Sequence, residues 1–253
     1  MSRRAVAVLL TGPPADRGCP PGVRRDAFAR ALAEDVADLV ADLPGIDALV
    51  AADPAGRRLA DEVVWPGTVV LDVPAGAGPL RVLAALAERG YEEGAVLAPD
   101  APDLPALLIA KPFSALAGAT VAAAPALPPL APLSPASTSP AELAAAARPG
   151  TAQAPGGGAA GAPAAGTLAI GGRTPNSYGL VALASRLPAP AWLADIAVDL
   201  DTPDAVARLR AVAPRRELVV APAWHRLRTP ADLAALDPGL EGWEATRALL
   251  SGH

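Results

Sequence analysis

Strand-like apolar runs alternate with amphipathic helical segments through the first half of the chain, and this alternation constrains the fold more than any other feature. The helical segment 26–43, for which Asp26 is a fitting cap, repeats large apolar residues at helical spacing. This order predicts a three-layer α/β fold, with a mostly parallel central sheet and helices on both faces. The expected strands are 5–10, 46–52, 68–73 and 94–99, and the expected helices are 26–43, 54–63, 79–90 and 106–116.

The alternation stops at a segment rich in proline, alanine and glycine, at about residues 127–164. Such a composition cannot bury enough apolar surface to offset the entropy that is lost on ordering. We therefore expect a disordered insertion that interrupts one domain spanning residues 1–253. A further strand is expected directly after it, at 166–172, where the sequence reads GTLAIGG.

Charge and composition argue against several classes of function. The 253 residues include 21 Lys and Arg against 26 Asp and Glu, so the chain lacks the basic surface that binds nucleic acid. Prolines interrupt the uncharged run 112–141, which excludes a membrane-spanning helix there. The apolar run at 5–10 is short for a signal peptide, and we expect a cytoplasmic protein. With two histidines and no Gly-x-Ser-x-Gly motif, a hydrolase triad is hard to build.

Two carboxylates follow the strand expected at 94–99, in the sequence VLAPDAPDLP. One interpretation is a helix start, with Asp103 as the N-cap and Pro105 in the first turn. The other is a metal or phosphate site built on Asp100 and Asp103, because open α/β sheets bind ligands at the carboxyl ends of their strands. The local sequence favours the helix start, and the metal or phosphate site stays the alternative.

Two further segments could hold phosphate. Gly76 and Gly78 lie between an expected strand and an expected helix, where backbone N–H groups can face an anion. The third glycine of a dinucleotide fingerprint is absent, since Arg81 takes its place. Arg24 and Arg25 form a local pair that could also bind a phosphate group.

A short sequence pattern occurs twice near the end of the chain. Residues 199–209 and 226–236 share Leu-x-Thr-Pro followed by a helical pattern, which predicts a Thr-capped helix with Pro at its first position in each copy. Charge distinguishes the copies. The first has Asp199 and Asp201 where the second has Arg226 and Arg228.

Several of these motifs together resemble the GT-A-type glycosyltransferase and nucleotidyltransferase superfamily. The nearest members are small bacterial family-A glycosyltransferase-like proteins, and 2-phospholactate guanylyltransferase and molybdenum-cofactor nucleotidyltransferases are more distant. The resemblance rests on GAGPLRVLAAL, the Asp-x-Pro-Asp-Leu of residues 100–104, LLIAKPFSALAGATVAAAPA, GTLAIGG and ELVVAPAWHRLRTPADLAAL.

The resemblance implies a site as well as a fold. In such enzymes the Asp-x-Pro acid holds Mg²⁺ or Mn²⁺ against the phosphates of a nucleotide or nucleotide sugar, which assigns that role to Asp100, with Asp103 as a helper. It also implies that Arg24 and Arg25 contact phosphate. The reaction would be glycosyl or nucleotidyl transfer from a nucleotide-activated donor.

The chain also departs from the family pattern. The late motif of the family carries two aspartates, whereas this chain has Arg226 and Arg228, and a guanidinium cannot coordinate a metal. Either Asp199 and Asp201 supply the missing ligands, or the second metal contact is lost. The first alternative predicts a metal-dependent transferase, and the second a non-catalytic relative that binds a nucleotide or a partner.

Overall fold

The computed structural model of the protein describes residues 2–12, 17–128 and 178–252. From residue 129 onward the predicted insertion lies outside these residues, as does the strand expected at 166–172, so the division of the chain stays a prediction. The described elements are β1 (Arg4–Leu10), α1 (Arg25–Ala41), β2 (Asp47–Ala52), α2 (Arg57–Val63), β3 (Val69–Asp72), α3 (Pro79–Glu88), β4 (Glu93–Leu97), α4 (Ala106–Ala115), β5 (Val121–Pro125), β6 (Leu180–Arg186), α6 (Ala191–Ala194), α7 (Ala205–Val212), β7 (Leu218–Val220), the 3₁₀ helix η1 (Pro230–Ala235) and α8 (Glu244–Ser251).

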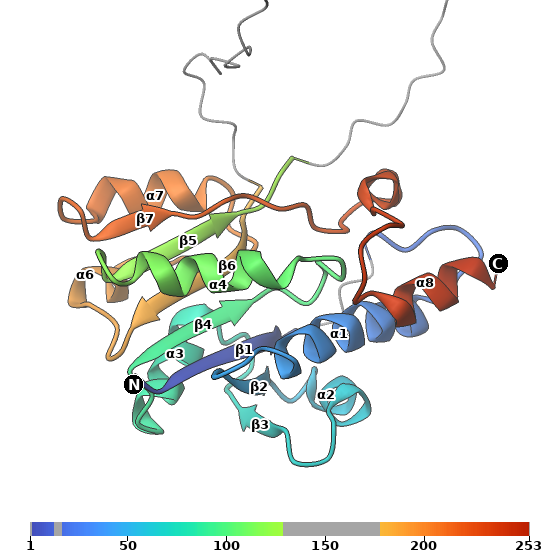
Figure 1. Cartoon of the computed structure of the whole chain (residues 1–253), viewed down its shortest axis with the longest axis horizontal. Helices are drawn as coiled ribbons and strands as arrows, with labels where there is room; N and C mark the ends of the chain where they lie inside the picture. The colour runs from blue at the N-terminus through green and yellow to red at the C-terminus, as the bar shows by residue number, and fades with distance from the viewer. Residues whose placement is uncertain (1, 13–16, 129–177, 253) are drawn as a thin grey trace, which may run out of the picture. The chain divides into compact units, whose positions relative to one another are not determined.

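Within the described residues, seven strands form one sheet in the order β3-β2-β1-β4-β6-β5-β7 (Figure 1). All neighbouring pairs are parallel except those that β6 makes with β4 and β5. The predicted α/β class with a mostly parallel sheet is confirmed, and strands from both halves of the sequence enter the same sheet. Because β6 runs the opposite way, its first residues lie at the edge where β1, β2, β4, β5 and β7 end.

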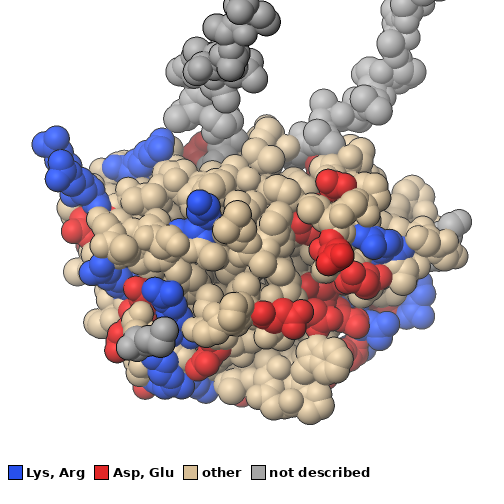
Figure 2. All heavy atoms as spheres, in the orientation of Figure 1, with Lys and Arg blue, Asp and Glu red and all other residues tan. Residues whose placement is uncertain are grey.

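The surface mixes both signs of charge. On the face seen in Figure 2, acidic side chains gather in the region of α1 and basic ones are interspersed around them, with no continuous basic field over the described residues of that face. In the described part of the chain, no helix is both long enough and apolar enough to cross a membrane.

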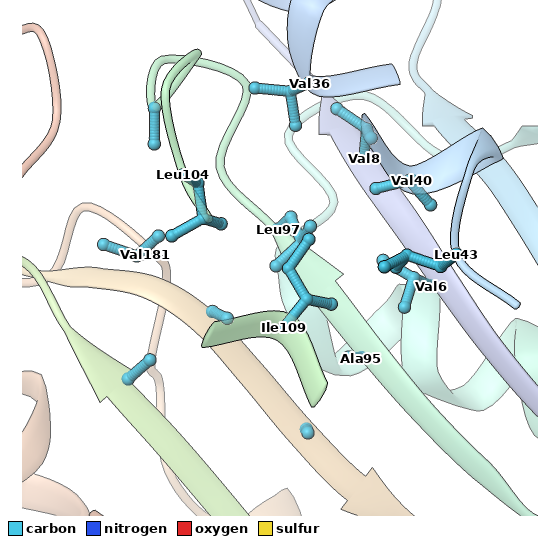
Figure 3. Close-up of a cluster of buried hydrophobic side chains, with 14 of the residues drawn as sticks. Val6, Val8, Val36, Val40, Leu43, Ala95, Leu97, Leu104, Ile109 and Val181 are labelled. Atoms are coloured by element: carbon cyan, nitrogen blue, oxygen red, sulfur yellow. The ribbon is translucent and has the colours of Figure 1, made fainter. Parts of the chain in front are cut away.

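Alternating residues of the strands feed two cores, one on each side of the sheet. Val6 and Val8 of β1 point to the side covered by α1, α2 and α4, where they meet Val36 and Val40 of α1 (Figure 3). The other side packs against α3, α6 and α7, and its core includes Leu83. Each buried Val or Leu contributes roughly 1.5–3 kcal/mol, which fixes the register of the strands.

Two helix starts have other N-caps than the sequence predicted. Helix α1 begins at Arg25 with Arg24 as its N-cap, so Asp26 is not the cap; its carboxylate pairs with the Arg24 side chain. Helix α4 begins after Pro105, so the prediction that Asp103 caps this helix is wrong. In each case a tertiary or neighbouring partner takes the carboxylate that the local pattern assigned to the helix.

The two Thr-Pro repeats also fold differently from each other. Thr229 caps η1 in a reciprocal box with Asp232, with Pro230 in the first turn, as predicted. Thr202 instead accepts a hydrogen bond from the Asp199 amide, and α7 starts later, after Asp204 in a left-handed conformation (φ 54°). The first repeat is therefore a loop that turns before its helix.

Asp35 joins the last helix to the first. Its carboxylate, on α1, accepts hydrogen bonds from the amides of Ala245 and Thr246 at the start of α8, both at 2.9 Å. Burial raises the pKa of Asp35 to about 6, against the stabilising effect of these amides on the charged form.

This pKa predicts a particular pH dependence of stability. Because the folded pKa lies above the ordinary value of 3.8, the folded state holds more protons between these values, and the free energy of unfolding falls as pH rises through them. Relative to Asp35→Asn, the wild-type protein should lose about 1–3 kcal/mol between pH 4 and pH 7, measured by urea unfolding. Asp42→Asn, an exposed change just after α1, is the control. A difference between wild type and Asp35→Asn that stays constant with pH would contradict the assignment.

Candidate functional site

The first sequence-predicted residue, Asp100, lies where β4 leaves the sheet. It is 3% exposed, and its backbone carbonyl accepts a 2.8 Å hydrogen bond from the amide of Leu227. That bond joins the loop after β4 to the loop after β7. Since both strands end at the same edge, the late motif with its arginines is brought directly onto the Asp100 loop.

Arg226 holds Asp100 from both sides of its carboxylate. Nε of Arg226 donates to Oδ1 of Asp100, and Nη2 donates to Oδ2 at 2.9 Å. Its third nitrogen, Nη1, donates to the backbone carbonyls of Leu180 and Leu200, at 3.0 and 3.1 Å. Both side chains are about 95% buried. Burial disfavours a charged guanidinium, but Asp100 and then Asp201 outweigh it and raise the pKa of Arg226 above its ordinary value.

Asp201 and Arg228 form a second, more accessible pair beside the first. Oδ1 of Asp201 accepts from Nη2 of Arg228 and lies 2.9 Å from Nη1 of Arg226. The Asp201 side chain is 57% exposed and that of Arg228 is 17% exposed. Burial opposes the ionisation of Asp201, yet Arg226 and Arg228 together hold its pKa below the usual value. Burial, followed by repulsion from Arg226, lowers the pKa of Arg228.

Two glycines allow these loops to approach. A Cβ on Gly179 would meet the carbonyl oxygen of Leu200 at 2.2 Å, and the φ of Gly179 is +93°. A Cβ on Gly18 would lie 2.5 Å from the carbonyl oxygen of Leu227. Only glycine fits at either position. The first contact presses the loop before β6 against the loop at Leu200, and the second presses the loop before α1 against the arginine motif.

A second buried aspartate, Asp53, organises the same edge of the sheet at the end of β2. Its carboxylate accepts four backbone hydrogen bonds, from the amides of Gly12, Ala55, Gly56 and Gly76. Burial opposes its ionisation, but these amides outweigh it and lower the pKa of Asp53. The sequence suggested that the amide of Gly76 could bind an anion. In the structure this amide donates a 3.2 Å hydrogen bond to the Asp53 carboxylate.

The loops enclose a cleft of about 490 Å³ at this edge. Among the described residues that line it, four are arginines and four are aspartates: Arg17, Arg25, Arg226, Arg228, Asp26, Asp100, Asp199 and Asp201. At the Arg228 end, Arg17 also acts on Asp201 and Arg228. Arg17, Arg226 and Arg228 therefore lie together around Asp201 at this end of the cleft.

The cleft brings together only some of the residues that the sequence suggested. Asp100, Arg25, Asp199 and Asp201 line it, whereas Gly76, Gly78, Arg24 and Asp103 do not. Gly78 lies just outside, since a Cβ there would come within 3.9 Å of the Asp199 carboxylate. Arg24 is exposed and pairs with Asp26. The metal and phosphate roles assigned to these residues stay predictions.

Asp103 has a different set of neighbours. Its side chain is fully buried, and Oδ1 accepts a 3.2 Å hydrogen bond from Nε1 of Trp224 and lies 2.9 Å from Nε2 of His225. The two aromatic rings stack on each other with centroids 4.9 Å apart. Asp103 therefore links the loop after β4 to the segment before Arg226.

The metal implied by the resemblance does not fit the described side chains. No group of three or more His, Cys, Asp or Glu side chains in the described ranges is placed to hold an ion. Both oxygens of Asp100 point at the guanidinium of Arg226, and Arg228 Nε lies 3.8 Å from Oδ2. A divalent cation on Asp100 would be repelled by both arginines, and Asp201 faces the same two charges.

Sequence reasoning missed Asp53 and Arg17. Both follow strand-like runs, in AADPAG and LLTGPPADRG, so their position at strand ends was available as a signal. What the sequence did not show is that Asp53 would be shared by three loops. Arg17 belongs to the loop that the Gly18 contact holds over Leu227.

A comparison with solved structures confirms the GT-A-type resemblance at the level of the fold. The structure that supports this statement is that of a candidate nucleotide-diphospho-sugar transferase from Desulfovibrio desulfuricans G20. It is 15% identical in sequence, with a TM-score of 0.58, and the match covers 100% of this chain and 98% of that one. No protein-family model and no curated protein sequence matches the chain.

Two mycobacterial structures match with lower TM-scores. One is a homologue, from Mycobacterium sp. strain JC1, of the Mycobacterium tuberculosis protein Rv0371c, at 15% identity and a TM-score of 0.48, covering 100% of this chain and 98% of that one. The other is the M. tuberculosis glucosyl-3-phosphoglycerate synthase in complex with Mg²⁺ and uridine diphosphate, at 13% identity and 0.44, covering 99% of this chain and 79% of that one.

The geometry predicts a large energetic difference between the two arginines. Arg226→Met leaves the Asp100 carboxylate buried without a counter-charge, which should cost about 3–5 kcal/mol of unfolding free energy. Arg228→Met removes a more exposed pair and should cost no more than ~1 kcal/mol. Urea unfolding measures both.

A double variant distinguishes the effect of the unpaired charge from the effect of changing the size of the Arg226 side chain. Arg226→Met combined with Asp100→Leu removes both charges, so it should recover much of the loss of the single variant. Equal costs for Arg226→Met and Arg228→Met, or a double variant no more stable than Arg226→Met alone, would contradict the account.

Proposed function

We propose that the protein binds the phosphate groups of a nucleotide or nucleotide sugar in this cleft through arginine, without a bridging metal ion. The observation that carries the proposal is the bidentate pair between Arg226 and Asp100. The pair occupies the carboxylate that the family pattern assigns to the metal, and it stands in a cleft where Arg17, Arg226 and Arg228 lie together around Asp201.

The arginines of the cleft have different proposed roles. Arg226 donates to Asp100 and to two backbone carbonyls, so its role is to neutralise Asp100 and hold the loops. The side chain of Arg228 is partly exposed. Burial and Arg226 lower its pKa, so an anion bound beside it would stabilise its charged form. Arg17 and Arg25 line the same cleft. A guanidinium group can donate two parallel hydrogen bonds to phosphate oxygens, so it can replace a metal ion as the positive charge that binds phosphate.

The class of ligand follows from the fold. The cleft lies at the carboxyl ends of parallel strands, where open α/β sheets bind their ligands. The D. desulfuricans structure is described as that of a candidate nucleotide-diphospho-sugar transferase. A nucleoside diphosphate, alone or bearing a sugar, therefore fits both the fold and the charge, and a cytoplasmic location would give access to such ligands.

A metal-dependent transferase is the second candidate, and one observation favours it. Asp199 and Asp201 line the same cleft as Asp100, as the compensating arrangement requires. For this candidate, Arg226 must leave Asp100 when the metal and donor bind. The protein would then transfer a glycosyl or nucleotidyl group with Mg²⁺ or Mn²⁺, and the two candidates differ in their response to metal.

A thermal-shift and calorimetry panel separates them. Nucleoside diphosphates and nucleotide sugars are titrated in EDTA and in Mn²⁺, and a bound ligand raises the melting midpoint by mass action. We expect binding in EDTA that Mn²⁺ does not strengthen. Arg228→Met should weaken it on the order of tenfold, because a charge-assisted contact of about 1.5 kcal/mol is lost. Arg24→Met, which changes an arginine of the same predicted pair outside the cleft, should leave affinity unchanged.

Three outcomes would count against the proposal. Binding that requires Mn²⁺ and disappears in EDTA would support the metal-dependent transferase. Equal weakening by Arg24→Met and Arg228→Met would place the ligand elsewhere. If no nucleoside diphosphate or nucleotide sugar binds, the proposed function is wrong.

A further inference from the structure

Asp201 occupies the place that a ligand phosphate needs. Its Oδ1 accepts from Nη2 of Arg228 and lies 2.9 Å from Nη1 of Arg226, so one carboxylate oxygen bridges the two guanidinium groups. A phosphate oxygen that approached Arg228 from the cleft would compete for the same N–H donors.

The surrounding contacts make Asp201 the group that can give way. Arg226 is held by Asp100 and by the carbonyls of Leu180 and Leu200. Arg228 is also held at Nη1, which donates to the carbonyl of Tyr178 at 3.2 Å. The Asp201 side chain is 57% exposed, so its carboxylate can turn into water while its backbone stays in place.

The backbone beneath Asp201 is fixed independently of its side chain. The amide of Leu180 donates to the carbonyl of Leu200 at 2.7 Å, and Gly179 lets the two segments touch. A change of side chain at position 201 can therefore alter the charge at Arg228 without releasing the loop.

We propose that Asp201 is an internal competitor for the anion site, so that a ligand binds only when its contacts exceed the cost of displacing this carboxylate, as those of two adjacent phosphate groups do. This inference rests on the proposed function. A single phosphate replaces one anion with another and gains little. A diphosphate displaces the carboxylate with one group and brings a second to the remaining arginines of the cleft, Arg17 and Arg25.

Asp199 offers a matched control. It is exposed and lines the same cleft, two residues away, but its Oδ1 accepts from the adjacent amide of Leu200 and no contact with Arg226 or Arg228 is recorded among the described residues. Asp199→Asn and Asp201→Asn remove the same charge and keep the size of the side chain. Only the second removes the competitor.

The test is calorimetric titration of pyrophosphate and of inorganic phosphate into wild type, Asp201→Asn and Asp199→Asn, in EDTA. We expect Asp201→Asn to bind pyrophosphate roughly 3- to 30-fold tighter than wild type, the effect of one nearby charge at an intermediate dielectric. Phosphate must displace the same carboxylate, so its affinity should rise by a similar factor. Asp199→Asn should change either affinity by about twofold at most, because its charge is farther from the guanidinium groups.

The titrations distinguish a failure of the Asp201 proposal from a failure of the proposed function. If wild type and both variants bind pyrophosphate with equal affinity, or if the two variants gain equally, Asp201 is not a competitor while the proposed function stands. If Asp201→Asn tightens pyrophosphate but leaves phosphate unchanged, the two anions do not displace the same group, and Asp201 is not their common competitor. If none of the three proteins binds pyrophosphate or a nucleoside diphosphate, the proposed function itself fails. Melting midpoints of the free variants close to that of wild type show that the fold is intact.

Discussion

The ion pair between Asp100 and Arg226 is the interaction on which the functional edge of this protein depends. It joins the end of β4 to the segment after β7, and the same guanidinium also bonds the start of β6 and the loop at Leu200. A buried Asp100 carboxylate without Arg226 would strongly destabilise the fold, and so would a buried Arg226 guanidinium without Asp100. Each side chain therefore makes the other one necessary.

The same pair changes what the site can do. In the pattern that the chain resembles, an aspartate at this strand end holds a cation, and the cation neutralises phosphate. Here the guanidinium of Arg226, which is part of the chain, binds both oxygens of the Asp100 carboxylate. The proposed function is recognition of phosphate by such guanidinium groups, which needs no metal. Lewis-acid activation of a leaving group would require Arg226 to move.

Much of the fold was predictable from the sequence because it rests on local periodicity. The strand–helix alternation gave the α/β class, and the position of Asp100 at a strand end placed it correctly at the edge of the sheet. The replacement of aspartates by Arg226 and Arg228 was also visible. The partners of carboxylates were not, since they lie far away in sequence: Asp53 bonds Gly76, and Asp103 contacts Trp224. The wrong helix cap at Asp103 has the same origin, whereas the carboxylate of Asp26 pairs with its near neighbour Arg24.

The most direct test of the central claim is to look for the metal. Crystals of the full chain grown with a nucleoside diphosphate and excess Mn²⁺ would be measured at the manganese absorption edge. The account predicts no anomalous peak within about 2–2.6 Å of the Asp100 carboxylate, with Arg226 still bonded to both of its oxygens. A manganese peak coordinated by Asp100, with the Arg226 guanidinium displaced from it, would contradict the account.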